Sequence, residues 1–117
     1  PEWFTEKDTT GGNIFHVVAS FGAIMDHDLP RWYYEQDVNP LWVNNNGQTP
    51  LELLACYSYR YMRQEKKLIE IARILLLAGN DPLMKNAKTG KSPLDRAQER
   101  HALWNVPATG ILLELLR

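Results

Sequence analysis

The sequence is poor in cysteine, in long apolar runs and in net charge. Cys56 is the one cysteine among 117 residues, so an internal disulfide is excluded and a reducing compartment is compatible with the count. No apolar stretch approaches the roughly 18 residues that a membrane-spanning helix needs. The formal net charge of −1 argues against a nucleic-acid binder that works through bulk charge. We therefore expect neither a membrane nor a nucleic acid among the partners.

The near-zero net charge hides an uneven distribution. Residues 1 to 46 carry seven acids and two bases, whereas residues 47 to 117 carry seven acids and eleven bases. The apolar content of 44% is enough for a packed core, and 117 residues suit one domain. Because no initiator methionine precedes Pro1, we expect that residue to be a processing or expression boundary. We also expect residues 1 to 117 to be a single domain from a larger protein, on the ground of the final helix described below.

Two six-residue patterns recur along the chain in the same order. The sequence GQTPLE at residues 47–52 returns as GKSPLD at 90–95, with a looser copy, GGNIFH, at 11–16. The sequence NPLWVN at residues 39–44 returns as DPLMKN at 81–86. An extended segment followed by a glycine turn therefore repeats, which favours a solenoid over a single closed fold.

Both close copies of the glycine pattern contain the residues that open a helix. Thr49 and Ser92 suit the N-cap position, because a short hydroxyl can accept from the exposed amides of the first turn. Pro50 and Pro93 follow at the first helical position, where a missing amide hydrogen costs nothing. The glycine two residues before each cap suits a tight turn with positive φ. We predict a helix directly after each cap.

The longest predicted helix is Leu68–Ala78, which Gly79 closes as the left-handed residue after the helix. Its apolar residues cover more than one side, as expected for a helix packed between neighbours. The main stripe consists of Leu68, Ile71, Ala72 and Leu75. We predict shorter helices over Ile14–Ser20, with Phe15, Val18 and Ala19 facing inward, over Leu51–Tyr57, and over Thr109–Leu116.

These patterns resemble the ankyrin-repeat family, whose repeat opens with G-x-T-P-L-H and has a second helix that ends in a leucine pair and glycine. Residues 47 to 97 match closely. Residues 11 to 46 match more weakly, because Ile14 replaces the proline and Pro30 interrupts the expected second helix. The resemblance implies an all-α solenoid of about three helix-turn-helix units joined by β-turn fingers, with repeats at 11–46, 47–89 and 90–117.

The segment Tyr57–Lys67 is longer than the family's usual connection between the two helices of a repeat. Its later residues are good helix formers, so we predict extended helices there. Two interpretations of the segment stay open. The tyrosines could cover an exposed edge of the core while the basic residues form a solvated face. Alternatively, the segment is a protrusion that binds a partner, since aromatic and cationic side chains are enriched at interface hot spots.

Residues that could support catalysis or hold a metal form no strong pattern. Cys56 with His16 or His101 could serve as nucleophile and base, but no flanking signature accompanies them, and Cys56 is expected to be a small buried apolar residue. The adjacent side chains of Asp26-His27-Asp28 do not converge on one ion without further ligands. The ankyrin resemblance implies that His16 bonds to backbone in a turn. We expect no catalytic residue, metal or cofactor.

The ankyrin resemblance implies a non-catalytic module that binds another protein through a concave face of fingers and first helices. Carried onto this sequence, the candidate contact residues are Val43, Asn44, Asn45, Asn46, Lys85, Asn86 and Lys88 in the fingers, and Glu52, Tyr57 and Asp95 in the first helices. Trp42 and Met84 occupy equivalent positions, and we expect them to pack at the finger base. The change from neutral asparagines to lysines along the fingers favours a partner with an acidic patch.

Further expectations concern the wider protein. A targeting or regulatory domain of a larger multidomain enzyme is the alternative function, and a stand-alone hydrolase is a weaker one. Irregular repeats and the asparagine-rich finger favour a bacterial or viral effector, located in the cytoplasm or in host-cell cytoplasm. The final helix has little polar surface over Ile111–Leu116, so we expect a neighbouring segment to cover it, with self-association as the alternative.

Overall fold

The computed structural model describes residues 11–12, 14–21 and 41–117. The α-helices in this part are α1 (Ile14–Phe21), α3 (Pro50–Cys56), α4 (Glu65–Leu77), α5 (Pro93–Trp104) and α6 (Pro107–Leu116), with a 3₁₀ helix, η3 (Ser58–Tyr61), after α3. The described residues contain no strand, so the all-α class is confirmed for them. The expectations for Asp26-His27-Asp28 and for Pro30 fall outside the described residues.

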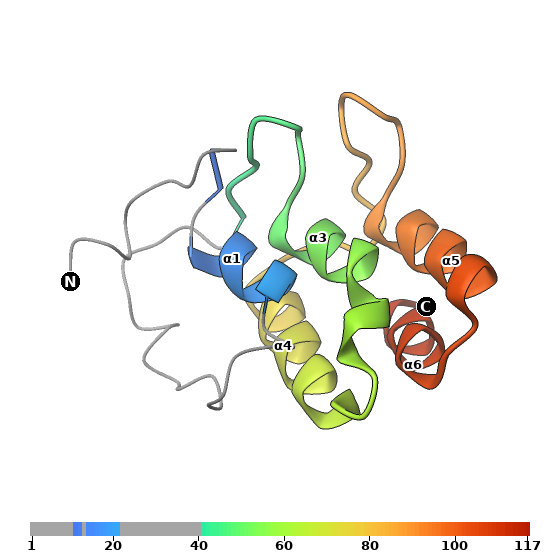
Figure 1. Cartoon of the computed structure of the whole chain (residues 1–117). Helices are drawn as coiled ribbons and strands as arrows, with labels where there is room; N and C mark the ends of the chain where they lie inside the picture. Colours follow the sequence, from blue (N-terminus) through green and yellow to red (C-terminus); the bar gives the residue numbers. More distant parts are fainter. Residues whose placement is uncertain (1–10, 13, 22–40) are drawn as a thin grey trace.

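The helices lie in two layers (Figure 1). In one layer α3 packs between α1 and α5, and in the other α4 packs against α6. The layers are joined because α3 also contacts α4 and α5 also contacts α6. Two long loops precede α3 and α5 and project from the same side of the molecule (Figure 1). We call residues 41–49 the first finger and residues 81–92 the second finger.

The first turns of α3 and α5 have the capping chemistry that the sequence predicts. The Thr49 hydroxyl accepts from the amide of Glu52 at 3.2 Å, and the Ser92 hydroxyl accepts from the amide of Asp95 at 3.1 Å. Asp95 returns a bond, since its carboxylate accepts from the Ser92 amide at 2.9 Å. This reciprocal arrangement is a capping box, and a proline follows each cap at the first helical position.

Helix α4 ends at Leu77, and Gly79, with a φ of +106°, is the predicted left-handed residue after the helix. The Gly79 amide donates to the carbonyl of Leu76 at 3.1 Å, and the next amide, of Asn80, donates to the carbonyl of Leu75 at 3.0 Å. This pair of bonds is the Schellman motif. Glycine takes the left-handed backbone conformation without the steric cost that a Cβ brings. The chain can therefore turn sharply from α4 into the second finger.

One continuous core lies between the layers, and it contains the residues predicted to face inward. In α1, Phe15, Val18 and Ala19 are buried, and in α4 the whole predicted stripe is buried. Helix α6 begins at Pro107, two residues before its predicted start, and also joins the core. Its contribution consists of Ala108, Leu112, Leu113 and Leu116.

The connection from α3 to α4 differs from the prediction in its first half. Helix α4 does begin early, at Glu65, but α3 stops at Cys56, and η3 replaces the expected extension of that helix. A left-handed residue, Arg63 (φ +64°), then separates η3 from α4. Side chains of η3 contact α1, which lies far away in the sequence. Local residue preferences therefore did not predict this 3₁₀ helix.

The C-terminal ends of α1 and α3 receive hydrogen bonds from the element that follows each of them in the stack. The buried Tyr61 hydroxyl lies 3.2 Å from the carbonyl oxygen of Ala19, and Arg60 Nη1 donates to the carbonyl of Ser20 at 3.2 Å. Arg100 Nε of α5 donates to the carbonyl of Cys56 at 2.9 Å. The last carbonyls of a helix have no partner within the helix, so these side chains satisfy them.

Candidate functional site

The first finger is folded around the side chain of Asn44, which is only 7% exposed. Its Oδ1 accepts from the amides of Asn46 at 3.0 Å and Gln48 at 2.9 Å, and its Nδ2 donates to Gln48 Oε1 at 3.1 Å. The main-chain amide of Asn44 donates to the Gln48 carbonyl at 3.0 Å. Asparagine suits this position because its short amide can replace backbone partners in a turn. The loop is therefore internally bonded.

The second finger repeats this construction around Asn86, which is 5% exposed. Its main-chain amide donates to the carbonyl of Lys91 at 2.9 Å, and its side-chain Oδ1 accepts from the main-chain amide of Lys88 at 2.8 Å. The side-chain Nδ2 points towards the first finger and donates to the carbonyl of Asn46 at 3.1 Å. Lys88 Nζ also donates across the gap, to the carbonyl of Asn45. The two fingers are thus hydrogen-bonded to each other.

Glu52 of α3 lies beneath this contact, and its residue surface is only 2% exposed. Asn86 Nδ2 lies 3.3 Å from Glu52 Oε1 and 3.2 Å from Oε2. Burial raises the pKa of the Glu52 carboxyl, because removing water disfavours the charged form, while the bond from Asn86 and the charge of Arg96 oppose that rise. Glu52 therefore anchors the second finger to α3.

His16 connects α1 to the first finger in an analogous way. It is 1% exposed, and its Nε2 donates to the main-chain carbonyl of Gln48 at 2.8 Å. The expected backbone bond of this histidine is confirmed. Nearby, the indole Nε1 of Trp42 donates to the carbonyl of Gly11 at 2.9 Å. Each finger is therefore attached to a residue near the start of the preceding first-layer helix, His16 in α1 and Glu52 in α3.

The predicted contact residues fall into three groups by exposure. The exposed group consists of Val43, Asn45, Asn46, Lys85 and Lys88, the half-buried group of Tyr57 and Asp95, and the buried group of Asn44, Glu52 and Asn86. The buried group shapes the fingers, since its polar atoms bond within the chain. Of the half-buried group, Asp95 belongs to the capping box, and its hydrogen bonds with Ser92 hold the pKa of its carboxyl below the usual range.

Apart from Val43, the exposed apolar side chains of the fingers were not among the predicted contact residues. Trp42 is 42% exposed and Met84 45% exposed, so neither is packed away at a finger base. Leu41 and Leu83 precede them and are exposed as well. The alignment of NPLWVN with DPLMKN contained the signal, because it placed apolar residues at two adjacent positions of each finger. The accessible finger surface is therefore apolar at its base and polar at its tip.

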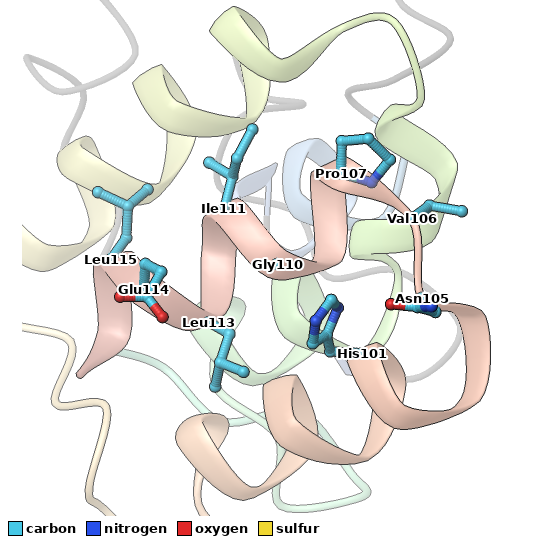
Figure 2. Close-up of a pocket in the computed structure, with 9 residues that line it drawn as sticks. All are labelled: His101, Asn105, Val106, Pro107, Gly110, Ile111, Leu113, Glu114 and Leu115. Carbon is cyan, nitrogen blue, oxygen red and sulfur yellow. The ribbon is translucent and has the colours of Figure 1, made fainter.

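A groove runs along the last helix, α6, where it meets the end of α5 (Figure 2). His101 points from α5 towards Gly110, and its Nδ1 lies 2.9 Å from the Thr109 hydroxyl. A Cβ at Gly110 would lie 3.1 Å from the His101 ring, so glycine permits this close packing. The apolar lining that stays partly exposed includes Ile111 and Leu115. Since Leu112, Leu113 and Leu116 are buried in the core, less apolar surface remains on α6 than its sequence suggests.

The residues weighed for catalysis have ordinary structural environments. Cys56 is buried, as predicted, with 7% of its surface exposed, and this burial raises the pKa of its thiol. The described part of the chain contains no cluster of three or more histidine, cysteine, aspartate or glutamate side chains able to hold a metal ion. Within the same residues no helix is both long enough and apolar enough to span a membrane.

Comparison with known proteins finds no family model that matches the chain and no significantly similar curated protein.

Proposed function

We propose that the chain is a non-catalytic protein-interaction module, an ankyrin-type solenoid that binds a partner protein through its fingers and the adjoining first-layer helices. The repeated order of finger, proline-initiated helix and second-layer helix supports the ankyrin assignment. The matching roles of Asn44 and Asn86 support it further. Both asparagines are buried and close their own finger through the same pair of main-chain and side-chain bonds.

One observation carries the binding proposal: the two fingers are fixed to each other while their tips stay exposed. The bonds from Asn86 to Asn46 and from Lys88 to Asn45 hold the loops in one arrangement. A surface that is already ordered loses less conformational entropy when it binds. Exposed loops on a rigid scaffold are also the usual place for recognition residues.

The charge of the second finger indicates the chemistry of the partner. The first finger, residues 41–49, contains no charged residue. The second finger carries one acid, Asp81, and three exposed lysines, Lys85, Lys88 and Lys91, of which Lys91 is paired with Glu99. A partner with apolar groups facing the first finger and carboxylates facing the second would match this surface. Charge complementarity of this kind raises association rates and selects among partners.

The test is affinity capture from eukaryotic cell lysate, since an effector would meet its partner in a host cell. Three forms of the chain are compared: the unaltered protein, a finger variant (Asn45→Ala, Lys85→Glu, Lys88→Glu), and a control variant (Arg73→Glu, Arg117→Glu) with the same change in net charge at exposed sites away from the fingers. Circular dichroism first establishes that all three are folded. A protein captured by the unaltered and control forms, and reduced at least about tenfold with the finger variant, supports the proposal. An identical set of proteins on all three forms contradicts it.

A further inference from the structure

A second surface lies at the opposite end of the first-layer helices from the fingers. The fingers precede the N-termini of α3 and α5, whereas this surface lies at their C-terminal ends (Figure 1). We call it the aromatic ledge and define it by Tyr57, Tyr59, Arg60, Leu103 and Trp104. With 12 residues, α5 separates it from the second finger by about 18 Å, at the usual helical rise.

The side chains of the aromatic ledge are ordered by contacts with one another. The rings of Tyr59 and Trp104 stack with centroids 4.4 Å apart and an interplanar angle of 9°. The Arg60 guanidinium lies over the Tyr57 ring, with its Cζ 4.1 Å from the centroid. Arg60 is also bonded to the carbonyl of Ser20, so three elements hold the ledge in place. These four side chains, of Tyr57, Tyr59, Arg60 and Trp104, therefore have little rotamer freedom to lose on binding.

The aromatic ledge nevertheless exposes much apolar surface. Trp104 is 48% exposed and Leu103 is 71% exposed, although both belong to the last turn of α5. Met62, which follows η3, is 56% exposed. Large side chains gathered at the surface mark interaction sites more often than scattered ones do. Tryptophan, tyrosine and arginine are also the residue types most enriched at binding hot spots.

Basic residues are frequent in the segment that supplies the two tyrosines of the ledge. The segment from Tyr57 to Lys67 contains four basic residues and one acid, Glu65. Arg63 and Lys66 are exposed, and neither takes part in an ion pair within the described residues. The acid of α5 nearest in sequence to Trp104, Glu99, is already paired with Lys91 and Arg96. The charges of Arg63 and Lys66 are therefore available to a partner.

We infer that the aromatic ledge is a second docking surface, which binds an acidic segment of a partner protein that carries an apolar anchor. The anchor packs on Trp104 and Leu103, and the carboxylates of the segment face Arg63 and Lys66. A cationic ligand fits less well, because a guanidinium already covers Tyr57. Nucleic acid fits less well, since Tyr59 and Trp104 stack on each other and the chain carries a net charge of −1.

The test begins with a library of random dodecapeptides displayed on phage and selected against the full chain. Enriched peptides are then synthesised with a fluorescent label, and their dissociation constants are measured by anisotropy. Two ledge variants are compared with the unaltered chain. Trp104→Ser removes the anchor site, and Arg63→Asn with Lys66→Glu removes the charge, with asparagine chosen because it tolerates the left-handed backbone at residue 63. The finger variant of the preceding subsection is the control.

The expected result is a selected set enriched in acidic residues around an aliphatic or aromatic residue. Binding should weaken at least about tenfold with each ledge variant, because few residues dominate such interfaces, and should be unchanged with the finger variant. A set without acidic residues, affinities unaffected by the ledge variants, or tighter binding to a labelled single-stranded oligonucleotide would each overturn the inference. Since the finger variant separates the two surfaces, loss of the ledge leaves the proposed function of the fingers standing.

Discussion

Asn86 of the second finger donates from one side-chain nitrogen to both carboxylate oxygens of Glu52, at 3.3 and 3.2 Å, and to the carbonyl of Asn46 at 3.1 Å. This amide therefore connects the second finger to α3 and to the first finger at once. Both side chains are buried, so water does not replace the bonds if one partner is lost.

Replacing Asn86 should destabilise the fold and uncouple the fingers. Asn86→Ala is expected to lower the free energy of unfolding by about 1–3 kcal/mol, because it leaves Glu52 and main-chain groups without their partner. Urea denaturation followed by circular dichroism measures the change. Asn86→Asp should cost more at pH 7, where two carboxylates would face each other, and less as the pH falls and they become protonated. An equal loss of unfolding free energy for Asn86→Asp at pH 7 and at acidic pH would contradict this account.

Glu52→Gln tests the electrostatic role of the buried carboxyl. Burial raises the pKa of Glu52 above its ordinary value of 4.5, so the folded state binds the proton more tightly than the unfolded state does. Its contribution to stability is then fully present below that ordinary pKa and declines as the pH rises through the folded value. Glutamine keeps an oxygen acceptor for Asn86 but does not titrate. The stability of the variant relative to the unaltered protein should therefore rise between about pH 4 and pH 7, and a fall over that range would mean that the pKa is lowered instead.

Two glycines at equivalent turns provide a matched pair of substitutions. Gly47 and Gly90 have φ values of +74° and +72°, so alanine at either one adopts a strained left-handed conformation costing about 1 kcal/mol. A Cβ at Gly47 would also lie 2.5 Å from Asn86 Oδ1, whereas a Cβ at Gly90 has no neighbour within 4 Å. Thermal denaturation should show that Gly47→Ala is the more destabilising change. Equal melting temperatures would mean that Asn86 moves aside without cost.

Tyr61→Phe tests the capping of α1. The buried hydroxyl lies 3.4 Å from the Val18 carbonyl oxygen and 3.2 Å from that of Ala19, and burial raises its pKa, which keeps it protonated as a donor. Losing this donor should cost about 1–2 kcal/mol of unfolding free energy in urea. Tyr59→Phe, which keeps the ring that stacks on Trp104, is the control and should cost less. If the two variants are equally stable, the hydroxyl of Tyr61 contributes nothing to the cap.

Local chemistry explains what the sequence could predict about the fold. The caps at Thr49 and Ser92, the prolines after them and the glycine stop at Gly79 each depend on residues within a few positions, so their patterns can be read directly. The buried stripe of α4 follows from helical periodicity. The 3₁₀ helix could not be predicted in this way, because Tyr61 and Arg60 bond to carbonyls that lie about 40 positions earlier in the chain.

The candidate site was predicted less well than the fold. The family resemblance placed Asn44, Asn86 and Glu52 among the partner contacts by their positions in the fingers and the first helices, yet all three are buried. Asn44 is bonded within its own finger, and Asn86 and Glu52 are bonded across segments more than 30 positions apart, which residue type alone does not reveal. Trp42 and Met84 are exposed for a different reason: an apolar residue type favours the core, but both residues lie in projecting loops.

Most side-chain bonds between segments far apart in the sequence donate from the later segment to the earlier one, while the bond from His16 to the Gln48 carbonyl runs the other way. Arg60 and Tyr61 finish α1, Arg100 finishes α3, and Asn86 reaches back to the first finger, so each unit completes the one before it. Recombination that deleted residues 47–89 would therefore shorten the chain and also remove the donors that cap α1. It would leave Arg100 facing the end of α1, where a tyrosine hydroxyl and an arginine now act together. The donor side chains of one unit therefore have to change together with the helix end that they cap in the preceding unit. The sequence of each unit depends on the unit beside it.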